Sequence, residues 1–188
     1  MEKLKKFISQ FVTLAPAEFE EVSKIFSPIN LKHGEYLVKE GKVGRQLAFI
    51  QSGYMRKYIN ASEGEETIHL SPPGEFIIPF YSFFSQQPSH ENLQAVTDCE
   101  LLVIPYQSVE NLYSQHPKLE RLGRLIMQHH ILLKEERLIS FVRQTTEERY
   151  NSLMEKHADY FQCIPLQYIA SYLGMTPETL SRIRAKKK

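Results

Sequence analysis

Residues 166–183, LQYIASYLGMTPETLSRI, have the pattern of two short helices joined by a tight turn. Ala170 supplies a small residue where the helices cross, and Gly174, four positions later, supplies the left-handed conformation that the turn requires. Thr176 is a good N-cap for the second helix, and Pro177 falls at its first position, where it loses no hydrogen bond. The stretch therefore predicts a helix-turn-helix, with an interior completed by Ile169, Leu173, Leu180 and Ile183.

The second of these helices presents polar side chains near its N-terminal end, the part of a helix-turn-helix that enters the major groove of DNA. Arg182 can donate two hydrogen bonds to guanine, and Glu178 can accept one from cytosine. The two residues are four apart and share a helix face, so a surface ion pair is the simpler alternative. The last residues, RIRAKKK, include five basic side chains among seven. Next to a helix-turn-helix this run predicts phosphate contacts by Arg184, Lys186 and Lys187. Without that neighbour, a tail that only increases solubility would be an equally good interpretation.

Upstream, residues 31–104 contain short apolar runs separated by glycines at intervals of about ten residues. Strands of four to six residues with glycine turns between them predict a small all-β barrel or sandwich. Residues 1–27 have helical spacing instead, in two runs. The predicted strands are residues 36–38, 47–50, 54–59, 67–70 and 93–104.

Helical spacing returns over residues 117–141, where apolar residues form two parallel rows. One row is a heptad-like seam that contains Leu122, Ile126 and Leu133, and the second contains Leu125, Leu132 and Ile139. One row can pack on the β-domain of the same chain, and the other needs a partner. We therefore expect a parallel homodimer with Leu122, Ile126 and Leu133 at its seam; an intramolecular helical hairpin is the alternative.

Residues 145–148, TTEE, fit a capping box that begins another helix. A break just before it divides the chain into three predicted parts. These are a β-domain over residues 1–116, a dimerisation helix and hinge over 117–143, and a DNA-binding domain over 144–188.

The composition is that of an ordinary globular protein, with 188 residues, 42% hydrophobic and 24% charged residues and a net charge of +1. No apolar run approaches the roughly 18 residues of a membrane helix, and the charged N-terminus lacks the core of a signal peptide. The sequence therefore predicts a cytoplasmic protein without membrane contact. Its two cysteines cannot provide four iron–sulfur ligands, and we expect no cofactor.

The glycine-rich β-domain, the long helix and the C-terminal helix-turn-helix together resemble the Crp/Fnr family of bacterial transcription regulators. The most specific part is Glu178-Thr-Leu-Ser-Arg182, which resembles the E-x-x-S-R signature of that family's recognition helix. The resemblance implies base contacts by Glu178, Ser181 and Arg182 and phosphate contacts by Gln167 and Thr179. It also implies an α+β fold with an N-terminal double-stranded β-helix (a β-roll, or jelly roll), a homodimer on palindromic double-stranded DNA, and RNA polymerase as a partner.

Members of that family that bind cyclic AMP use a Gly-Glu pair and an arginine about ten residues later. In the family register the pair falls at Ile78-Pro79 and the arginine near Ser89, and no Lys or Arg lies between Lys57 and Tyr106. Without a cation the cyclic phosphate would lose a charge-assisted hydrogen-bond pair. We therefore expect no ordinary cyclic-nucleotide binding; a non-standard phosphate cassette is the alternative.

An unknown small-molecule effector remains an expectation for the β-domain. Its aromatic stretch and the residues after it predict a pocket, although such a stretch is more often core: Phe76, Phe80, Tyr81, Phe83, Ser89 and His90. Two other readings stay open. One is a cupin-like metal enzyme built on His33, His69 and His90, which lacks the required H-x-H pattern. The other is an interaction module with a degenerate DNA-binding appendage. We predict no metal site and no enzyme.

Overall fold

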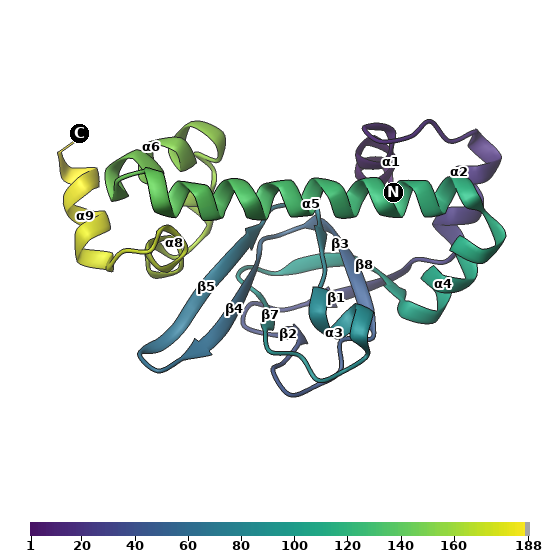
Figure 1. Ribbon diagram of the computed structural model, residues 1–188, viewed down its shortest axis with the longest axis horizontal. Helices are drawn as coiled ribbons and strands as arrows, with labels where there is room; N and C mark the ends of the chain where they lie inside the picture. Colours follow the sequence, from purple (N-terminus) through teal and green to yellow (C-terminus); the bar gives the residue numbers. More distant parts are fainter. Residues whose placement is uncertain (187–188) are drawn as a thin grey trace.

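The structure is a computed structural model that describes residues 1–186; the predicted phosphate contact Lys187 lies outside the described residues. One long helix, α5 (Pro117–Arg143), runs along the whole molecule. A β-roll lies against its middle, two N-terminal helices lie near its beginning, and four short helices gather at its end (Figure 1). Helices, the β-roll, the long helix and the short C-terminal helices follow one another as predicted.

The roll consists of two antiparallel four-stranded sheets, in the orders β1-β8-β3-β6 and β2-β7-β4-β5. Their facing side chains form an apolar core that includes Ile50, Met55 and Leu93, all fully buried. Gly53 turns the chain between β3 and β4 with φ +85°, and a Cβ there would lie 2.2 Å from the Asp98 carbonyl oxygen, so only glycine fits. The strands are β1 (Ser27–Leu31), β2 (Tyr36–Val38), β3 (Gln46–Ser52), β4 (Met55–Ala61), β5 (Gly64–Ser71), β6 (Phe76–Ile77), β7 (Asn92–Ala95) and β8 (Cys99–Pro105).

Helices cover the roll at the end where the chain begins. Leu4, Phe7 and Ile8 of α1 enter a core shared with β3, α4 and the first half of α5. Gly123 lets α4 approach α5 closely, because a Cβ there would overlap the Tyr113 hydroxyl. The helices of this part are α1 (Glu2–Ser9), α2 (Pro16–Lys24), α3 (Phe80–Ser85) and α4 (Tyr106–Gln115).

The end of α5 leads into the C-terminal helices, which have a core of their own. The predicted capping box is present: Thr145 Oγ1 accepts from the Glu148 N–H at 3.3 Å, and Glu148 Oε2 accepts from the Thr145 N–H at 2.7 Å. It begins α6. The helices of this part are α6 (Thr146–Lys156), α7 (Tyr160–Cys163), α8 (Leu166–Leu173) and α9 (Pro177–Ala185).

The predicted fold class is confirmed, with local differences among its elements. The sequence pattern missed β1, whose Pro28 interrupts any alternation; as an edge strand paired only with β8, β1 tolerates that proline. Residues 93–104, predicted as one strand, are two strands, β7 and β8, because the chain turns between them. The turn is held by Thr97 Oγ1, which accepts from the Tyr54 N–H at 2.9 Å.

Two of the three predicted seam residues, Leu122 and Ile126, are covered within the chain itself. Leu122 and Ile126 are each 7% exposed, since they pack in the core between α5, the N-terminal helices and the roll. The second row is open over the later part of the helix, where Leu132 is 62% and Ile139 43% exposed. The row nearest the roll is buried within the chain, so the neighbouring row is the one open to a partner.

Candidate DNA-reading surface and adjoining cavity

The helix-turn-helix has the predicted geometry. Ala170 and Leu180 are fully buried where α8 and α9 cross, and the Met175 N–H donates to the Ala170 carbonyl at 3.0 Å. Gly174 caps α8 in the left-handed conformation, with φ +66°. Thr176 caps α9 by accepting from the Thr179 N–H at 3.3 Å, with Pro177 in the first turn.

On the outer side of α9 the predicted base-reading side chains Glu178, Ser181 and Arg182 are exposed. Within the described residues no ion pair joins Glu178 to Arg182. Instead, the N–H of Glu178 itself and the Thr176 hydroxyl hold the pKa of the Glu178 carboxyl below its usual range. Arg182 is therefore available to an external acceptor.

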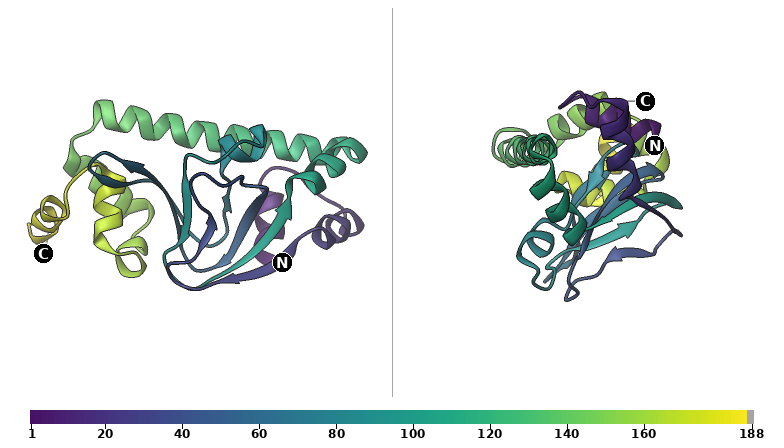
Figure 2. Two further views of the ribbon diagram at one scale, coloured as in Figure 1. Left: turned by 90° about the horizontal axis from the view of Figure 1, so that it is seen from below. Right: turned by 90° about the vertical axis from the view of Figure 1, so that its right-hand side faces the viewer.

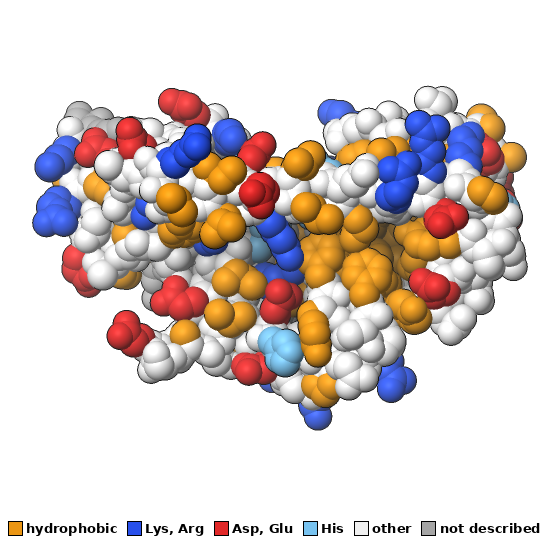
Figure 3. Space-filling view, in the orientation of Figure 1, with side chains coloured by type: hydrophobic (Ala, Val, Ile, Leu, Met, Phe, Trp, Pro, Cys, Tyr) orange, Lys and Arg blue, Asp and Glu red, His pale blue; other side chains and the backbone are white. Residues whose placement is uncertain are grey.

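The predicted phosphate contacts are placed around these residues. Gln167 and Lys186 are exposed, while Thr179 and Arg184 are half-buried. Basic side chains gather at the end of the molecule formed by α9 (Figures 1 and 3). Within residues 1–186 these side chains lie at an exposed end of the molecule, where a large polyanion can reach them.

Replacement of Gly174 by alanine is expected to lower the free energy of unfolding by about 1–2 kcal/mol, because an L-residue is strained at positive φ. The new Cβ would also lie 2.5 Å from the ring of Phe141. The expected fall in Tm is roughly 2–4 °C per kcal/mol, measured by calorimetry. Gly34→Ala is the control, since φ there is +85° with nothing within 4 Å; an equal fall in both variants would show that contact with Phe141 adds nothing.

The C-terminal helices are fastened to the roll mainly through α8, which lies beside β5 (Figure 2). The guanidinium of Arg56, 2% exposed, lies between the rings of Tyr58 and Tyr168, at 4.0 and 3.7 Å from their centroids. Ser171 Oγ accepts from the Thr67 N–H at 2.8 Å. The helix-turn-helix is therefore docked on the β-roll rather than joined to it by a free linker.

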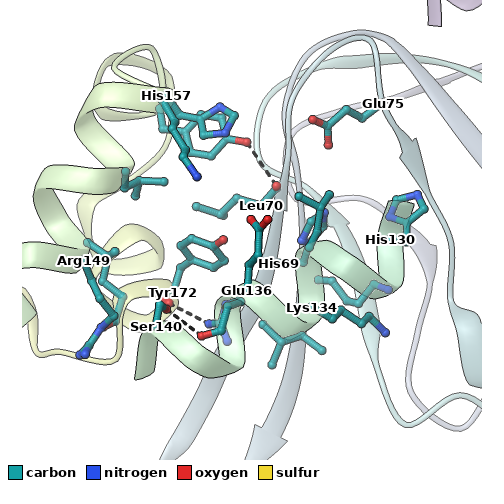
Figure 4. A pocket seen from close by; sticks show the side chains of 18 of the residues that line it. His69, Leu70, Glu75, His130, Lys134, Glu136, Ser140, Arg149, His157 and Tyr172 are labelled. Carbon is teal, nitrogen blue, oxygen red and sulfur yellow. Dashed lines mark hydrogen bonds between the residues drawn. The ribbon is translucent and has the colours of Figure 1, made fainter. Parts of the chain in front are cut away.

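A cavity of about 420 Å³ lies where the roll, α5 and the C-terminal helices meet. Its side chains converge from two sides (Figure 4). His69, His130 and Lys134 come from the roll and α5, and Tyr172 and His157 from the C-terminal part. The volume is in the range of small-molecule sites.

Buried charge is concentrated on the roll side of this cavity. Lys57 is 3% exposed; its ammonium donates to the Ile78 carbonyl at 2.6 Å and pairs with Glu91 at 3.2 Å. Burial lowers the pKa of Lys57 to about 8. Burial, followed by the nearby positive charges, lowers the pKa of His69 to about 3 and that of His130 to about 4. Burial raises the pKa of Glu75 to about 7.

The lowered pKa of His130 predicts how the free energy of unfolding depends on pH. Between about pH 6.5 and 4 the unfolded chain binds a proton on this imidazole that the folded chain does not, so stability falls as the pH falls. One such group contributes a slope of about 1.4 kcal/mol per pH unit. Glu75, with its raised pKa, acts in the opposite direction but equally in wild type and variant. Urea unfolding at pH 7, 6 and 5 should therefore show a shallower loss of stability in His130→Gln; equal slopes would contradict a buried neutral imidazole.

The predicted effector pocket is only partly the observed cavity. Phe76 and Phe80 line it, but the other four residues lie elsewhere. Phe83 is buried in the roll core, and Ser89 closes a turn by accepting from the Glu91 N–H at 3.1 Å. Tyr81 and His90 pack against each other, with ring centroids 4.6 Å apart. The aromatic pattern did not predict the residues that give the cavity its charge, Lys57, Lys134 and Arg137. The one sequence feature that could have indicated them is a charged residue within an apolar run.

The other candidate chemistries find no support in the geometry. Within residues 1–186 no three His, Cys, Asp or Glu side chains are grouped to hold a metal ion, and this includes the cupin-like set His33, His69 and His90. Among the described helices none is long and apolar enough to cross a bilayer.

Known proteins share the sequence pattern of this chain. Residues 28–116 match the cyclic nucleotide-binding domain family. The chain is 26% identical to the fumarate and nitrate reduction regulatory protein of Vibrio cholerae over 91% of its own length and 73% of that protein's. It is 27% identical to electron transport regulator A of Shewanella oneidensis, over 81% of this chain and 65% of that protein.

Solved structures share the fold. FixK2 from Bradyrhizobium japonicum superposes with a TM-score of 0.75 at 18% identity, over 86% of this chain and 84% of that one. The catabolite activator protein of Thermus thermophilus gives 0.60 at 22% identity, over 94% and 84%. A β-roll sensor joined by one long helix to a helix-turn-helix defines a class of bacterial transcription regulators. In sequence and in fold the chain is similar to the Crp/Fnr regulators of that class, as the sequence resemblance predicted.

Proposed function

We propose that this protein is a homodimeric, sequence-specific DNA-binding transcription regulator that acts in the bacterial cytoplasm. The observation that carries the proposal is the exposed set Glu178, Ser181 and Arg182 on α9, held above a fully buried helix-turn-helix core. The named regulators that the chain resembles support it. RNA polymerase is the further partner that this function implies. No observation favours an enzyme.

The homodimer is proposed to form through the exposed row of α5 rather than through Leu122 and Ile126. Leu132 and Ile139 are exposed apolar residues on this row, and their contact with water is costly. Leu133, the third residue of the predicted seam, is 36% exposed and lines the cavity, so it borders this row rather than forming its centre.

Selection of bound DNA from a random pool tests the proposal directly. A dimer with one α9 in each major groove should select a palindrome whose half-site centres lie about one helical turn, roughly 34 Å, apart. By family likeness the half-sites should resemble TTGAT or TGTGA, with a guanine opposite Arg182. A pool without any enriched motif would contradict sequence-specific binding and favour the interaction-module reading.

Tight binding of cyclic AMP or cyclic GMP is not expected, although the matching family is named for such ligands. At the place of the Gly-Glu pair stand the buried Ile78 and Pro79, and Ser89 at the arginine place bonds within its own turn. The nearby ammonium of Lys57 already has the Ile78 carbonyl and Glu91 as partners. Isothermal titration calorimetry should show no affinity in the micromolar range; a micromolar dissociation constant would support a non-standard cassette instead.

A further inference from the structure

The cavity between the roll, α5 and the C-terminal helices has more cations than carboxylates. Five cationic side chains line it against three acidic ones. Because burial raises the pKa of Glu75 to about 7, one of the three carboxylates is partly protonated at neutral pH, which increases the positive excess. The cations are Lys57, Lys134, Arg137, Arg149 and Lys156, and the acids are Glu75, Glu91 and Glu136.

Three donors on one face of α5 point to the same region. His130, Lys134 and Arg137 are spaced by four and three residues, so they lie one above the other along the helix. Figure 4 shows His130 and Lys134 at one end of the cavity, near His69. A ligand there would touch the helix and the roll together.

Some polar groups of these three side chains have no hydrogen-bond partner among the residues that the structure describes. His130 is 8% exposed, and its Nε2 has no hydrogen-bond partner; the Nε of Arg137 is likewise buried and unpaired. The other nitrogen contacts of Arg137 are to carbonyl oxygens, that of Tyr172 at 2.8 Å and that of Thr67 at 3.5 Å. Among the described residues no carboxylate pairs with Lys134, whose ammonium lies over the ring of Phe80 at 4.4 Å. Buried polar groups without partners are rare and costly.

We propose that this cavity binds a small polyanion, a molecule with two or more carboxylate or phosphate groups, through Lys134, Arg137 and His130. The charge excess favours a dianion or trianion over the single charge of a cyclic nucleotide. The size of the cavity limits the ligand to a small molecule. This inference rests on the proposed function only in making the polyanion the effector of the regulator.

Such a ligand would act on DNA binding by a direct route. Arg137 donates to the carbonyl of Tyr172 at the end of α8, and Arg149 of α6 donates to that of Leu173 at 2.9 Å. An anion that draws Arg137 toward itself would weaken the hold of α5 on the first helix of the helix-turn-helix. Ligand binding therefore changes the relative stability of the docked arrangement, as linkage requires.

The test measures ligand binding without DNA. Citrate, 3-phosphoglycerate and pyrophosphate are titrated into the full chain by calorimetry and thermal shift, against KCl of matched ionic strength and against cyclic AMP. We expect at least one polyanion to bind saturably and raise Tm, and to shift the imidazole NMR signals of His130. Since these three probes separate carboxylate from phosphate recognition, they also show which group the site prefers.

Variants locate the binding. Lys134→Gln and Arg137→Gln should each weaken the polyanion about tenfold or more, the loss of one charge-assisted contact. Lys118→Gln, on the same helix but outside the cavity and paired only with Glu18, should leave the affinity unchanged. Lys134 is exposed enough for its variant to fold even where Arg137→Gln does not.

Three results would overturn the proposal. These are no gain in Tm above that in KCl for any of the three polyanions, equal affinity in wild type and Lys134→Gln, or tighter binding of cyclic AMP than of every polyanion. DNA selection is performed separately on the unliganded chain. If no DNA motif is selected, the proposed regulator function is wrong but the anion site is not contradicted. If no polyanion binds, the anion site is wrong but the regulator function is not contradicted.

Discussion

Arg182→Ala is expected to weaken binding to the selected operator by about 1–3 kcal/mol, roughly 5- to 150-fold, while binding to random DNA hardly changes. The reason is geometric: Arg182 is exposed on α9, makes no ion pair with Glu178 in the described structure, and can give both of its terminal nitrogens to one guanine. Fluorescence anisotropy on the operator, on operators substituted at that guanine, and on random duplex measures the effect. The preference for guanine at that single position should flatten.

Neutralisation of the basic tail is the contrasting experiment. Substitution of Lys186 and Lys187 by glutamine should weaken binding on every sequence and make the salt dependence shallower by about one unit per lost phosphate contact. Arg121→Ala, an exposed arginine on α5 far from α9, is the matched control. If Arg182→Ala weakens operator and random DNA equally, Arg182 contacts phosphate rather than a base.

Leu132→Asp is expected to convert the dimer into a monomer and to lower operator affinity by about 10²–10⁴-fold, because two linked half-site contacts become one. Leu132 is 62% exposed on the row of α5 that is proposed to meet the partner. A carboxylate buried there without a counter-charge is strongly unfavourable. Sedimentation equilibrium at micromolar concentration, together with anisotropy on the full palindrome, measures both effects.

The matched control is Met154→Asp, an equally apolar-to-acidic change at an exposed residue of α6. It should leave the sedimentation mass at twice that of the monomer. Ile126→Asp separates the two rows of α5 further: since Ile126 lies in the core of the chain, this variant should lower the free energy of unfolding of the monomer itself. Sedimentation of the wild-type chain as a monomer alone would contradict the proposed homodimer.

The sequence pattern predicted what depends on neighbours along the chain. Gly174, Thr176 and Pro177 specify a turn and a cap by their own backbone preferences, so the order of residues alone is enough to predict the helix-turn-helix. The same holds for the capping box of Thr145 and Glu148.

Long-range packing cannot be predicted in this way. Two apolar rows on α5 predict that both are covered, but only the positions of α1 and the roll decide which row is covered within the chain. Lys57 looks like an ordinary charged residue of a surface strand, and its burial against Ile78 and Glu91 arises only when β4, β6 and the loop before β7 come together. The cavity is lined by such residues. This explains why the aromatic pattern predicted only two of its lining residues, Phe76 and Phe80.

The docking of α8 on β5 has a consequence for the length of the operator. With Tyr168 holding Arg56, and Ser171 bonded to the Thr67 N–H, each α9 has little freedom to swing about a tether. One base pair added between the half-sites moves the second about 3.4 Å along the duplex and turns it by roughly 34° around the axis. A tethered domain would follow that displacement at small cost, whereas a docked one has to break the contacts of α8 or bend the DNA. We therefore expect the length of the operator spacer to matter as much as its bases, because of protein surfaces that never touch the duplex.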